Sequence, residues 1–200
     1  MNCIKEVCEH FKSAAAFTIT DLKVFLRKKG VGGGYLSLLV HNLLAKHEMR
    51  RIARGVYTFH TETEVAGFGF RPFYYGLQEA LSLRNLWEQE TNPVVITPRK
   101  VRSGVRTFEG ANYVVRRINR RMFFGFEMMK YADFWIPVSD VEKTFLDFVY
   151  FKQALSREAL AEIKKRANEK TLNGYLKRCP KWMRKKAREL LKLPKPRIEL

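Results

Sequence analysis

The chain has 200 residues, with 38 lysines and arginines against 20 aspartates and glutamates, so its formal net charge is +18. This length allows one large domain or two small ones. The sequence has no run of about 18 apolar residues, which excludes a membrane-spanning helix, and its first residues lack the apolar core of a signal peptide. The positive charge favours a polyanionic partner, nucleic acid before an anionic membrane, over a merely solvated basic surface.

The three cysteines, Cys3, Cys8 and Cys179, form no paired framework and no Cys-x-x-Cys metal spacing. They are typical of small apolar side chains in a reducing compartment. We therefore expect a cytoplasmic protein without a metal site.

The positive charge is distributed unevenly along the chain. Residues 1–60 contain 10 basic and 4 acidic residues, residues 61–152 contain 13 and 11, and residues 153–200 contain 15 and 5. We interpret the two basic ends as contact surfaces and the nearly neutral middle as a scaffold or a protein-binding module.

Two helices open the chain. The first covers residues 2–12, where apolar residues recur at helical spacing. The second begins after Thr20, a suitable N-cap, and stops at Gly30. The segment GVGGG at 30–34 resembles a phosphate-binding loop, but it lacks the Gly-Lys-Ser/Thr ending of that motif. A turn between two helices is the expected structure.

A third helix is predicted over residues 35–47. One face is an apolar stripe of leucines and valine that belongs to the core. The opposite face has no acidic residue and carries uncharged hydrogen-bonding groups, the kind that reach base edges and phosphates. This face consists of Tyr35, Ser37, Leu38, His41, Asn42 and Lys46.

A basic β-hairpin follows in RRIARGVYTF at residues 50–59. Gly55 supplies the positive φ that a tight turn needs, which puts Arg54 at the tip. Arg50 and Arg51 are neighbours on the first strand and point to opposite faces, so only one of them can face DNA.

Helix, helix, turn, helix and basic hairpin is the order of a winged helix-turn-helix domain, which we predict for residues 1–62. The third helix would lie in the major groove, with Ser37 and His41 nearest the bases. The candidate DNA-binding residues are Tyr35, Ser37, His41, Asn42, Lys46, Arg50, Arg51 and Arg54. The alternative is a small α/β domain with a solvated basic hairpin.

Residues 63–152 read as a small mixed α+β domain. A helix is expected over 71–89 with Pro72 in its first turn. Strands are expected over 92–98, 112–118, 121–131 and 134–138, as judged from short apolar runs bounded by turn residues. A final helix over 139–151 has a capping box between Ser139 and Glu142.

No catalytic constellation is present. The four histidines lie at positions 10, 41, 47 and 60, whereas the acidic residues of the last part of the middle segment are Asp133, Asp140, Glu142 and Asp147. The chain shows no triad, metal cluster or nucleotide-binding loop. We therefore predict a protein that is not an enzyme and needs no cofactor.

Residues 153–200 are predicted to form a basic helical segment. Ser156 caps a helix over 156–170, and one or two more helices follow. Candidate polyanion-binding residues are Lys177, Arg178, Lys181, Arg184, Lys185, Lys186 and Arg188. Such a basic amphipathic helix can meet DNA, an acidic partner or a membrane surface, or it can be a solvated charged face. With a DNA-binding domain before it, we favour DNA or an acidic partner.

Three segments together resemble the AbiEi antitoxin family, which forms the antitoxin and repressor half of AbiE-type toxin–antitoxin systems. They are LLAKHEMRRIARGVYTF at 43–59, PFYYGLQEALSLRNL at 72–86 and IPVSDVEKTFLDFVYF at 136–151. The resemblance implies an N-terminal winged helix that binds promoter DNA. It also implies a C-terminal domain that opposes a nucleotidyltransferase-like toxin.

The sequence therefore predicts a DNA-binding transcriptional regulator that represses its own promoter as an antitoxin. A non-catalytic RNA- or protein-binding module is the alternative, and a nuclease is the third hypothesis. The operator and the oligomeric state stay open.

Overall fold

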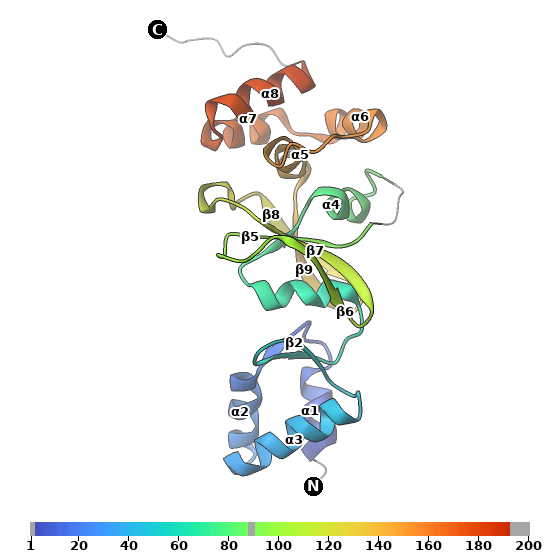
Figure 1. Cartoon of the computed structure of the whole chain (residues 1–200), viewed down its shortest axis with the longest axis vertical. Coiled ribbons are helices and arrows are strands. Elements are labelled where there is room, and N and C mark those ends of the chain that lie inside the picture. Colours follow the sequence, from blue (N-terminus) through green and yellow to red (C-terminus); the bar gives the residue numbers. More distant parts are fainter. Residues whose placement is uncertain (1–2, 88–90, 193–200) are drawn as a thin grey trace.

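The computed structural model describes residues 3–87 and 91–192 and is a mixed α+β structure. Its elements form three layers along the long axis of the molecule (Figure 1). Three helices with a small sheet lie at one end, a larger sheet lies in the middle, and a group of helices lies at the other end. In the described part of the chain, no helix combines the length and the apolar character that crossing a membrane requires.

The first layer contains α1 (Cys3–Phe11), α2 (Ile19–Lys28) and α3 (Gly33–Ala45). The apolar sides of these helices share one core, which includes Leu22, Leu26, Leu39 and Leu43. The expectation that Thr20 caps the second helix was wrong, because Thr18 caps it. The Thr18 hydroxyl accepts the Asp21 amide at 3.1 Å, and the Asp21 carboxylate accepts the Thr18 amide at 2.7 Å. The reciprocal box needs an acid three residues after the cap, and only Thr18 has that spacing to Asp21.

A small antiparallel sheet completes this layer, in the order β1-β3-β2. Its strands are β1 (Phe17–Thr18), β2 (Arg50–Ala53) and β3 (Val56–Thr58). The predicted hairpin is confirmed, with Arg54 and Gly55 in its turn and Gly55 at φ +74°. The Ile19 amide donates to the Gly55 carbonyl at 2.9 Å, so this turn lies against the start of α2.

The middle layer is a six-stranded mixed sheet in the order β6-β7-β5-β4-β9-β8. The strands are β4 (Tyr74–Tyr75), β5 (Val94–Thr97), β6 (Gly104–Phe108), β7 (Ala111–Arg117), β8 (Phe126–Tyr131) and β9 (Phe134–Ser139). The pairs β5–β7 and β4–β9 are parallel, and the other pairs are antiparallel.

Three of the four predicted strands correspond to β5, β7 and β9, while the fourth forms only in its second half as β8. A 3₁₀ turn, η2 (Arg120–Met122), precedes it. The helix expected over 71–89 was too long, because only α4 (Leu77–Leu83) forms there. Pro72 is not in its first turn, since the aromatic pair Tyr74–Tyr75 is buried in the sheet as β4. A 3₁₀ helix, η1 (Thr63–Phe70), links the small sheet to this layer and packs against β2.

The third layer contains α5 (Val141–Tyr150), α6 (Arg157–Arg166), α7 (Glu169–Arg178) and α8 (Lys181–Leu191). The last three helices all pack against α5. Ser156 caps α6 as expected, since its hydroxyl accepts the Ala159 amide at 3.1 Å. The helix predicted over 156–170 ends earlier than expected, because Asn168 caps a new helix, α7.

The capping box expected at Ser139 and Glu142 was wrong. Asp140 is the N-cap of α5, and its carboxylate accepts the Lys143 amide at 2.7 Å. Ser139 is instead buried, with its hydroxyl 2.7 Å from that of Thr144. Glu142 accepts the Asn168 amide at the start of α7. The carboxylate that was expected to cap its own helix therefore connects two helices.

Candidate nucleic-acid interface

Helix α3 has one exposed face because its leucines and valine fill the core on the other side. Leu39, Val40 and Leu43 are buried against the first two helices. Ser37 and His41 lie one turn apart on the outer face and are exposed. Leu38 lies beside them with 54% of its surface exposed. The outer face is therefore a polar strip with one apolar contact point.

The other residues predicted for this face occupy different environments. Lys46 is exposed directly after α3, at the C-cap. Asn42 is half-buried at the side of the helix. Tyr35 is half-buried and packs against the core of the N-terminal layer, so its ring serves the fold. Ser37, His41 and Lys46 are therefore the exposed polar residues of the predicted set, and Ser37 and His41 are neighbours four residues apart on α3.

The start of α3 is open. Its N-cap is Gly32, which provides no side-chain hydrogen bond, and a Cβ added at Gly33 or Gly34 would meet nothing within 4 Å. The free amide groups of a first helical turn attract anions. The glycines that were expected to make a turn therefore also leave room for another molecule to approach the helix.

The hairpin arginines separate into two groups. The Arg50 side chain donates to the Glu109 carboxylate at 2.9 Å and is 19% exposed, so it is held against the β6–β7 turn. Arg51 and Arg54 are exposed, and neither forms an ion pair with any residue that the structure describes. Arg51 and Arg54 are therefore the hairpin cations available to a polyanion.

A second basic surface, which the sequence did not predict, lies on the middle layer. We call it the sheet hollow; it measures about 920 Å³ and is lined by Pro98, Arg99, Lys100, Arg117, Ile118, Asn119, Arg120 and Tyr150. All four of its cations are exposed. Arg99 also donates to the Gly69 carbonyl at 3.1 Å, which ties the hollow to η1 and so to the small sheet.

The net charge of residues 61–152 gave no indication of the sheet hollow. The middle segment is nearly neutral in sum, but three of its acids, Glu79, Glu142 and Asp147, are buried and do not neutralise the surface. The cations that line the hollow also lie just after β5 and at and after the end of β7, two segments that only the pairing of these strands brings together. Leaving out the acids that fall within apolar helical runs would have revealed this excess of positive charge.

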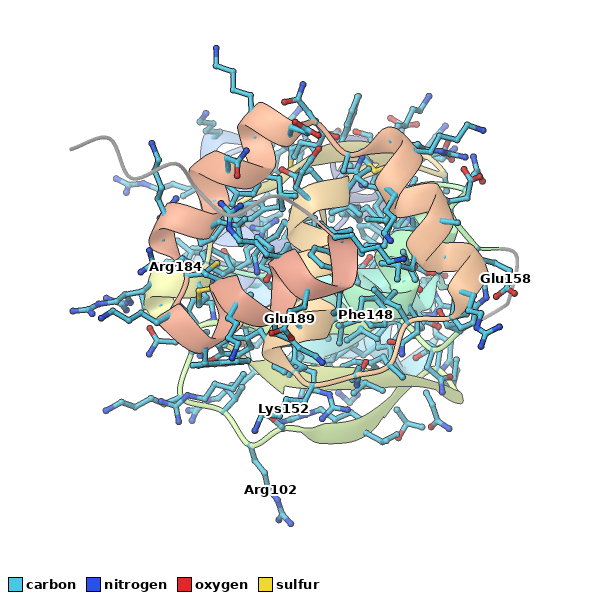
Figure 2. The ribbon with its side chains drawn as sticks, turned by 90° about the horizontal axis from the view of Figure 1, so that it is seen from above. Arg102, Phe148, Lys152, Glu158, Arg184 and Glu189 are labelled. Atoms are coloured by element: carbon cyan, nitrogen blue, oxygen red, sulfur yellow. The ribbon has the colours of Figure 1, made fainter. Side chains whose placement is uncertain are left out.

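The C-terminal cations differ in exposure and in their partners. Six of the seven are exposed: Lys177, Arg178, Lys181, Arg184, Lys185 and Lys186. Arg188 is half-buried and donates to Asn173 at 3.2 Å. The Arg178 guanidinium lies 4.1 Å from the ring centre of Phe124, an arrangement that favours a fixed position. Figure 2, viewed from above onto α5–α8, shows Arg184 and Glu158 at opposite sides of this layer and Arg102 reaching outward from the loop before β6.

Exposed cations thus occur on all three layers: Lys46, Arg51 and Arg54 on the first, those of the sheet hollow on the second, and those of α7 and α8 on the third. Within residues 3–87 and 91–192, no group of three or more His, Cys, Asp or Glu side chains is placed to hold a metal ion. Cation clusters of this kind can bind phosphates without any chemical step. Neither a protein-family model nor a curated protein sequence matches the chain.

Proposed function

We propose that this protein is a DNA-binding transcriptional regulator whose residues 1–62 form a winged helix-turn-helix domain. The observation that carries the proposal is the order α1-β1-α2-α3-β2-β3 combined with the sheet order β1-β3-β2. In helix-turn-helix proteins the second helix of the pair lies in the major groove. That helix is α3 here, and its outer face carries no acidic side chain.

The exposed side chains of α3 and the hairpin fall into two chemical groups. Ser37 and His41 can hydrogen-bond base edges, while Lys46, Arg51 and Arg54 can neutralise phosphates. The hairpin is short, because Ala53 and Val56 are already paired across its turn. We therefore assign Arg54 to the phosphate backbone beside the groove rather than to the floor of the minor groove.

We further propose that the regulator is the antitoxin of a toxin–antitoxin pair, repressing its own promoter and opposing a nucleotidyltransferase-like toxin. Support for this part comes from the resemblance of the three sequence segments to AbiEi antitoxins. In the third segment, the residues Glu142, Lys143 and Asp147 are buried in α5. We therefore expect that segment to specify the fold of the second domain rather than a contact site.

The test of DNA binding uses the full chain and the duplex found upstream of its own gene. Fluorescence anisotropy at two salt concentrations would be compared with a shuffled duplex of the same composition. We expect the native duplex to bind at least about 10³-fold more tightly and both affinities to fall with salt. Equal affinity for the two duplexes, or no binding, would overturn the proposal.

The antitoxin part has a separate test. The product of the adjacent gene would be expressed alone and together with this chain, and growth would be measured. Growth arrest that this chain relieves is the expected result. A harmless neighbour, or arrest that persists, would refute the antitoxin role and leave the DNA-binding proposal intact.

A further inference from the structure

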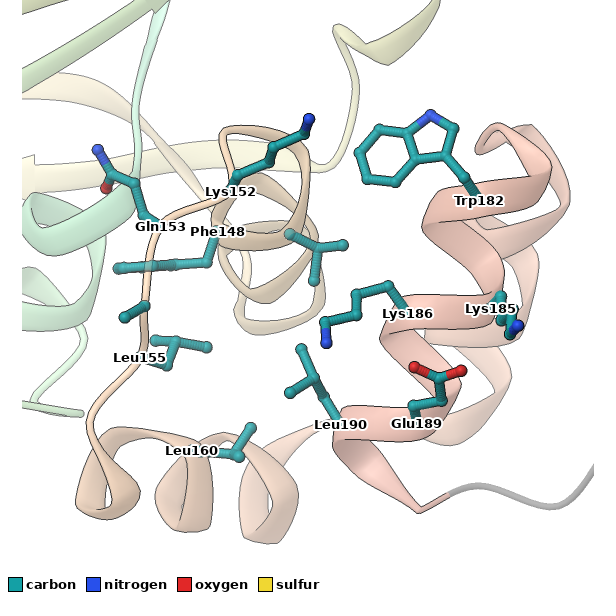
Figure 3. A pocket seen from close by; sticks show the side chains of 12 residues that line it. Phe148, Lys152, Gln153, Leu155, Leu160, Trp182, Lys185, Lys186, Glu189 and Leu190 are labelled. Atoms are coloured by element: carbon teal, nitrogen blue, oxygen red, sulfur yellow. The ribbon is translucent and has the colours of Figure 1, made fainter.

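A hollow lined mainly by apolar side chains lies in the C-terminal layer, between α6 and α8, with the end of α5 as its floor (Figure 3). We call it the helix hollow; its volume is about 820 Å³. Phe148 forms part of the floor, Leu155 and Leu160 form one wall, and Trp182 and Leu190 form the other. Each of α6 and α8 packs against α5, and the space between them is open.

Trp182 is the most informative residue of this hollow. It is 47% exposed, although Met183 and Ala187 on the same helix are fully buried. Figure 3 shows the indole at the rim, directed toward the side of the hollow where Lys152 lies. Exposed tryptophans at the edge of an apolar hollow are typical anchors of protein interfaces.

The charged groups around the hollow are nearly all positive. Lys152, Lys185 and Lys186 line it, and Glu189 is the acid among its lining residues. In Figure 3 the amino group of Lys186 points into the hollow, toward its apolar side. None of the three lysines lies within 4.0 Å of a carboxylate in the described part of the chain. An ammonium group that faces apolar surface gains most from a carboxylate brought by a ligand.

We propose that the helix hollow binds an acidic amphipathic helix of a partner protein. The apolar floor and Trp182 would receive the apolar stripe of that helix, as in other helix-in-groove complexes. Lys152 lies on one side of the hollow and Lys186, with Glu189 beside it, on the other, so an acid on each flank of the stripe can meet a lysine. A nucleic acid backbone would leave the apolar floor unused.

The occupant is a different protein rather than a second copy of this chain. A net charge of +18 opposes self-association through a surface rimmed by lysines. The proposal is also independent of DNA binding, because the hollow and α3 lie at opposite ends of the molecule (Figure 1). One proposal can therefore fail while the other stands.

The test uses the full chain and a synthetic peptide of about 14 residues with leucine at helical i, i+3, i+4 and i+7 positions and glutamate elsewhere. The peptide is kept below the concentration at which it self-associates. Controls are a scrambled peptide of the same composition and a version with lysine in place of glutamate. Binding is followed by the tryptophan indole signals in a ¹⁵N–¹H spectrum and by calorimetry.

Matched variants assign the site. Trp182→Ser is compared with Trp135→Ser, because Trp135 is similarly exposed at 56% but lies on β9. Lys186→Gln is compared with Lys177→Gln, an exposed lysine on α7 outside the hollow. Circular dichroism melts confirm that each variant is folded.

We expect saturable micromolar binding of the acidic amphipathic peptide that shifts the Trp182 indole signal and leaves that of Trp135 in place. Trp182→Ser should weaken binding at least about 10-fold, and Lys186→Gln should weaken it about 2–5-fold and reduce its salt dependence. The two control variants should bind like the original protein. Operator affinity of Trp182→Ser should be unchanged.

Four outcomes would overturn the proposal. These are no saturable binding, equal binding of the scrambled or lysine peptide, full binding by Trp182→Ser, and a shift of the Trp182 signal by dodecanoate but not by the peptide. The last result would assign the hollow to a small carboxylate amphiphile instead of a protein.

Discussion

Helix α5 buries several polar and charged side chains in the interior of the protein. Lys143 and Asp147 are both fully buried and form an ion pair one helical turn apart. The Tyr74 hydroxyl donates to the same carboxylate at 2.9 Å. Burial raises the pKa of Asp147, and the neighbouring Lys143 opposes that shift. Removing either Lys143 or Asp147 would leave the other as an unpaired buried charge, so the two stabilise the fold only as a pair. The Tyr74 hydroxyl connects this pair in α5 to β4.

We expect Tyr74→Phe to lower the free energy of unfolding by about 1.5–3 kcal/mol, since it removes a hydrogen bond to a buried charged group. Urea denaturation measures the change. Tyr113→Phe is the matched control, because Tyr113 is also buried and the structure describes no hydrogen bond from its hydroxyl. Equal losses in the two variants would contradict a special role for the Tyr74 hydroxyl.

Glu79 makes stability depend on pH. Burial, with a smaller contribution from Glu64, raises the pKa of Glu79 to about 7 from an ordinary 4.5. Between these two pH values the folded state holds a proton that the unfolded state has lost, so stability falls as pH rises and levels off above pH 7. Across this pH range the free energy of unfolding falls by at most about 3 kcal/mol.

We therefore expect Glu79→Gln to increase stability at pH 8 and to leave it nearly unchanged at pH 4.5. Urea denaturation at the two pH values checks this. Asp133→Asn serves as the control, because Asp133 is exposed and forms no ion pair with any residue that the structure describes. If the Glu79 variant were less stable at pH 8 than the original protein, the sign of the pKa shift would be wrong.

Arg54 is the residue through which the hairpin would meet DNA. We expect Arg54→Ala to weaken binding to all duplexes about equally and to reduce the slope of log affinity against log salt by about one. Anisotropy titrations over a range of salt concentrations measure both. Arg50→Ala should leave the slope unchanged, because Arg50 is held by Glu109. An unchanged slope for Arg54→Ala would remove the hairpin from the interface.

At the scale of elements, α3 combines two tasks on two faces. Its buried leucines pack against α1 and α2 in one core, and its outer face is exposed. Half-buried Tyr35 and Asn42 lie between these faces. Changes at the outer face should therefore affect recognition without loss of stability, whereas changes at Tyr35 should affect both.

We expect His41→Ala to change which operator sequence is preferred, with a loss of about 1–3 kcal/mol for the native duplex if a base contact is removed. A competition assay with single-base operator variants measures the preference. Ser37→Ala should behave similarly, while Lys46→Ala should weaken all duplexes alike. A uniform loss for His41→Ala would show that α3 only positions the protein on DNA.

The C-terminal helices α6, α7 and α8 are an integral part of the folded molecule. Leu172, Leu176, Met183 and Ala187 are buried in the same core as Phe145 of α5. Deleting residues after Phe151 would expose this core, so the role of the C-terminal cations must be tested by substitution. The sheet hollow lies next to the N-terminal layer, since Arg99 contacts η1, which packs on β2.

We expect Arg117→Gln combined with Arg120→Gln to reduce the salt slope of operator binding by about two, if DNA continues from the hairpin onto the sheet hollow. Lys181→Gln combined with Arg184→Gln should leave the slope unchanged for a short duplex, because α8 and α3 lie at opposite ends (Figure 1). The reverse result would place the DNA path over the C-terminal helices instead.

The sequence alone determined the features whose free energy is local. Helical spacing located α1, α2, α3 and α5, and Gly55 marked the hairpin turn with Arg54 at its tip. Ser156 was recognised as a cap because its partner lies three residues away. In each case the interacting groups are neighbours in the chain, so their pattern is visible before folding.

Two local caps were predicted at the wrong residue, since Thr18 rather than Thr20 begins α2 and Asp140 rather than Ser139 begins α5. The other features that the sequence did not predict depend on groups far apart in the chain, which only folding brings together. The two-residue strand β1 exists because β3 pairs with it, and Tyr74–Tyr75 form a strand because β5 and β9 flank them. Glu142 accepts the amide of Asn168, which lies 26 residues further along the chain, while Asp140 caps α5. Both hollows are lined by segments that meet only after folding. The net charge of the middle segment therefore did not predict the sheet hollow, and the apolar periodicity of the C-terminal helices did not predict the helix hollow.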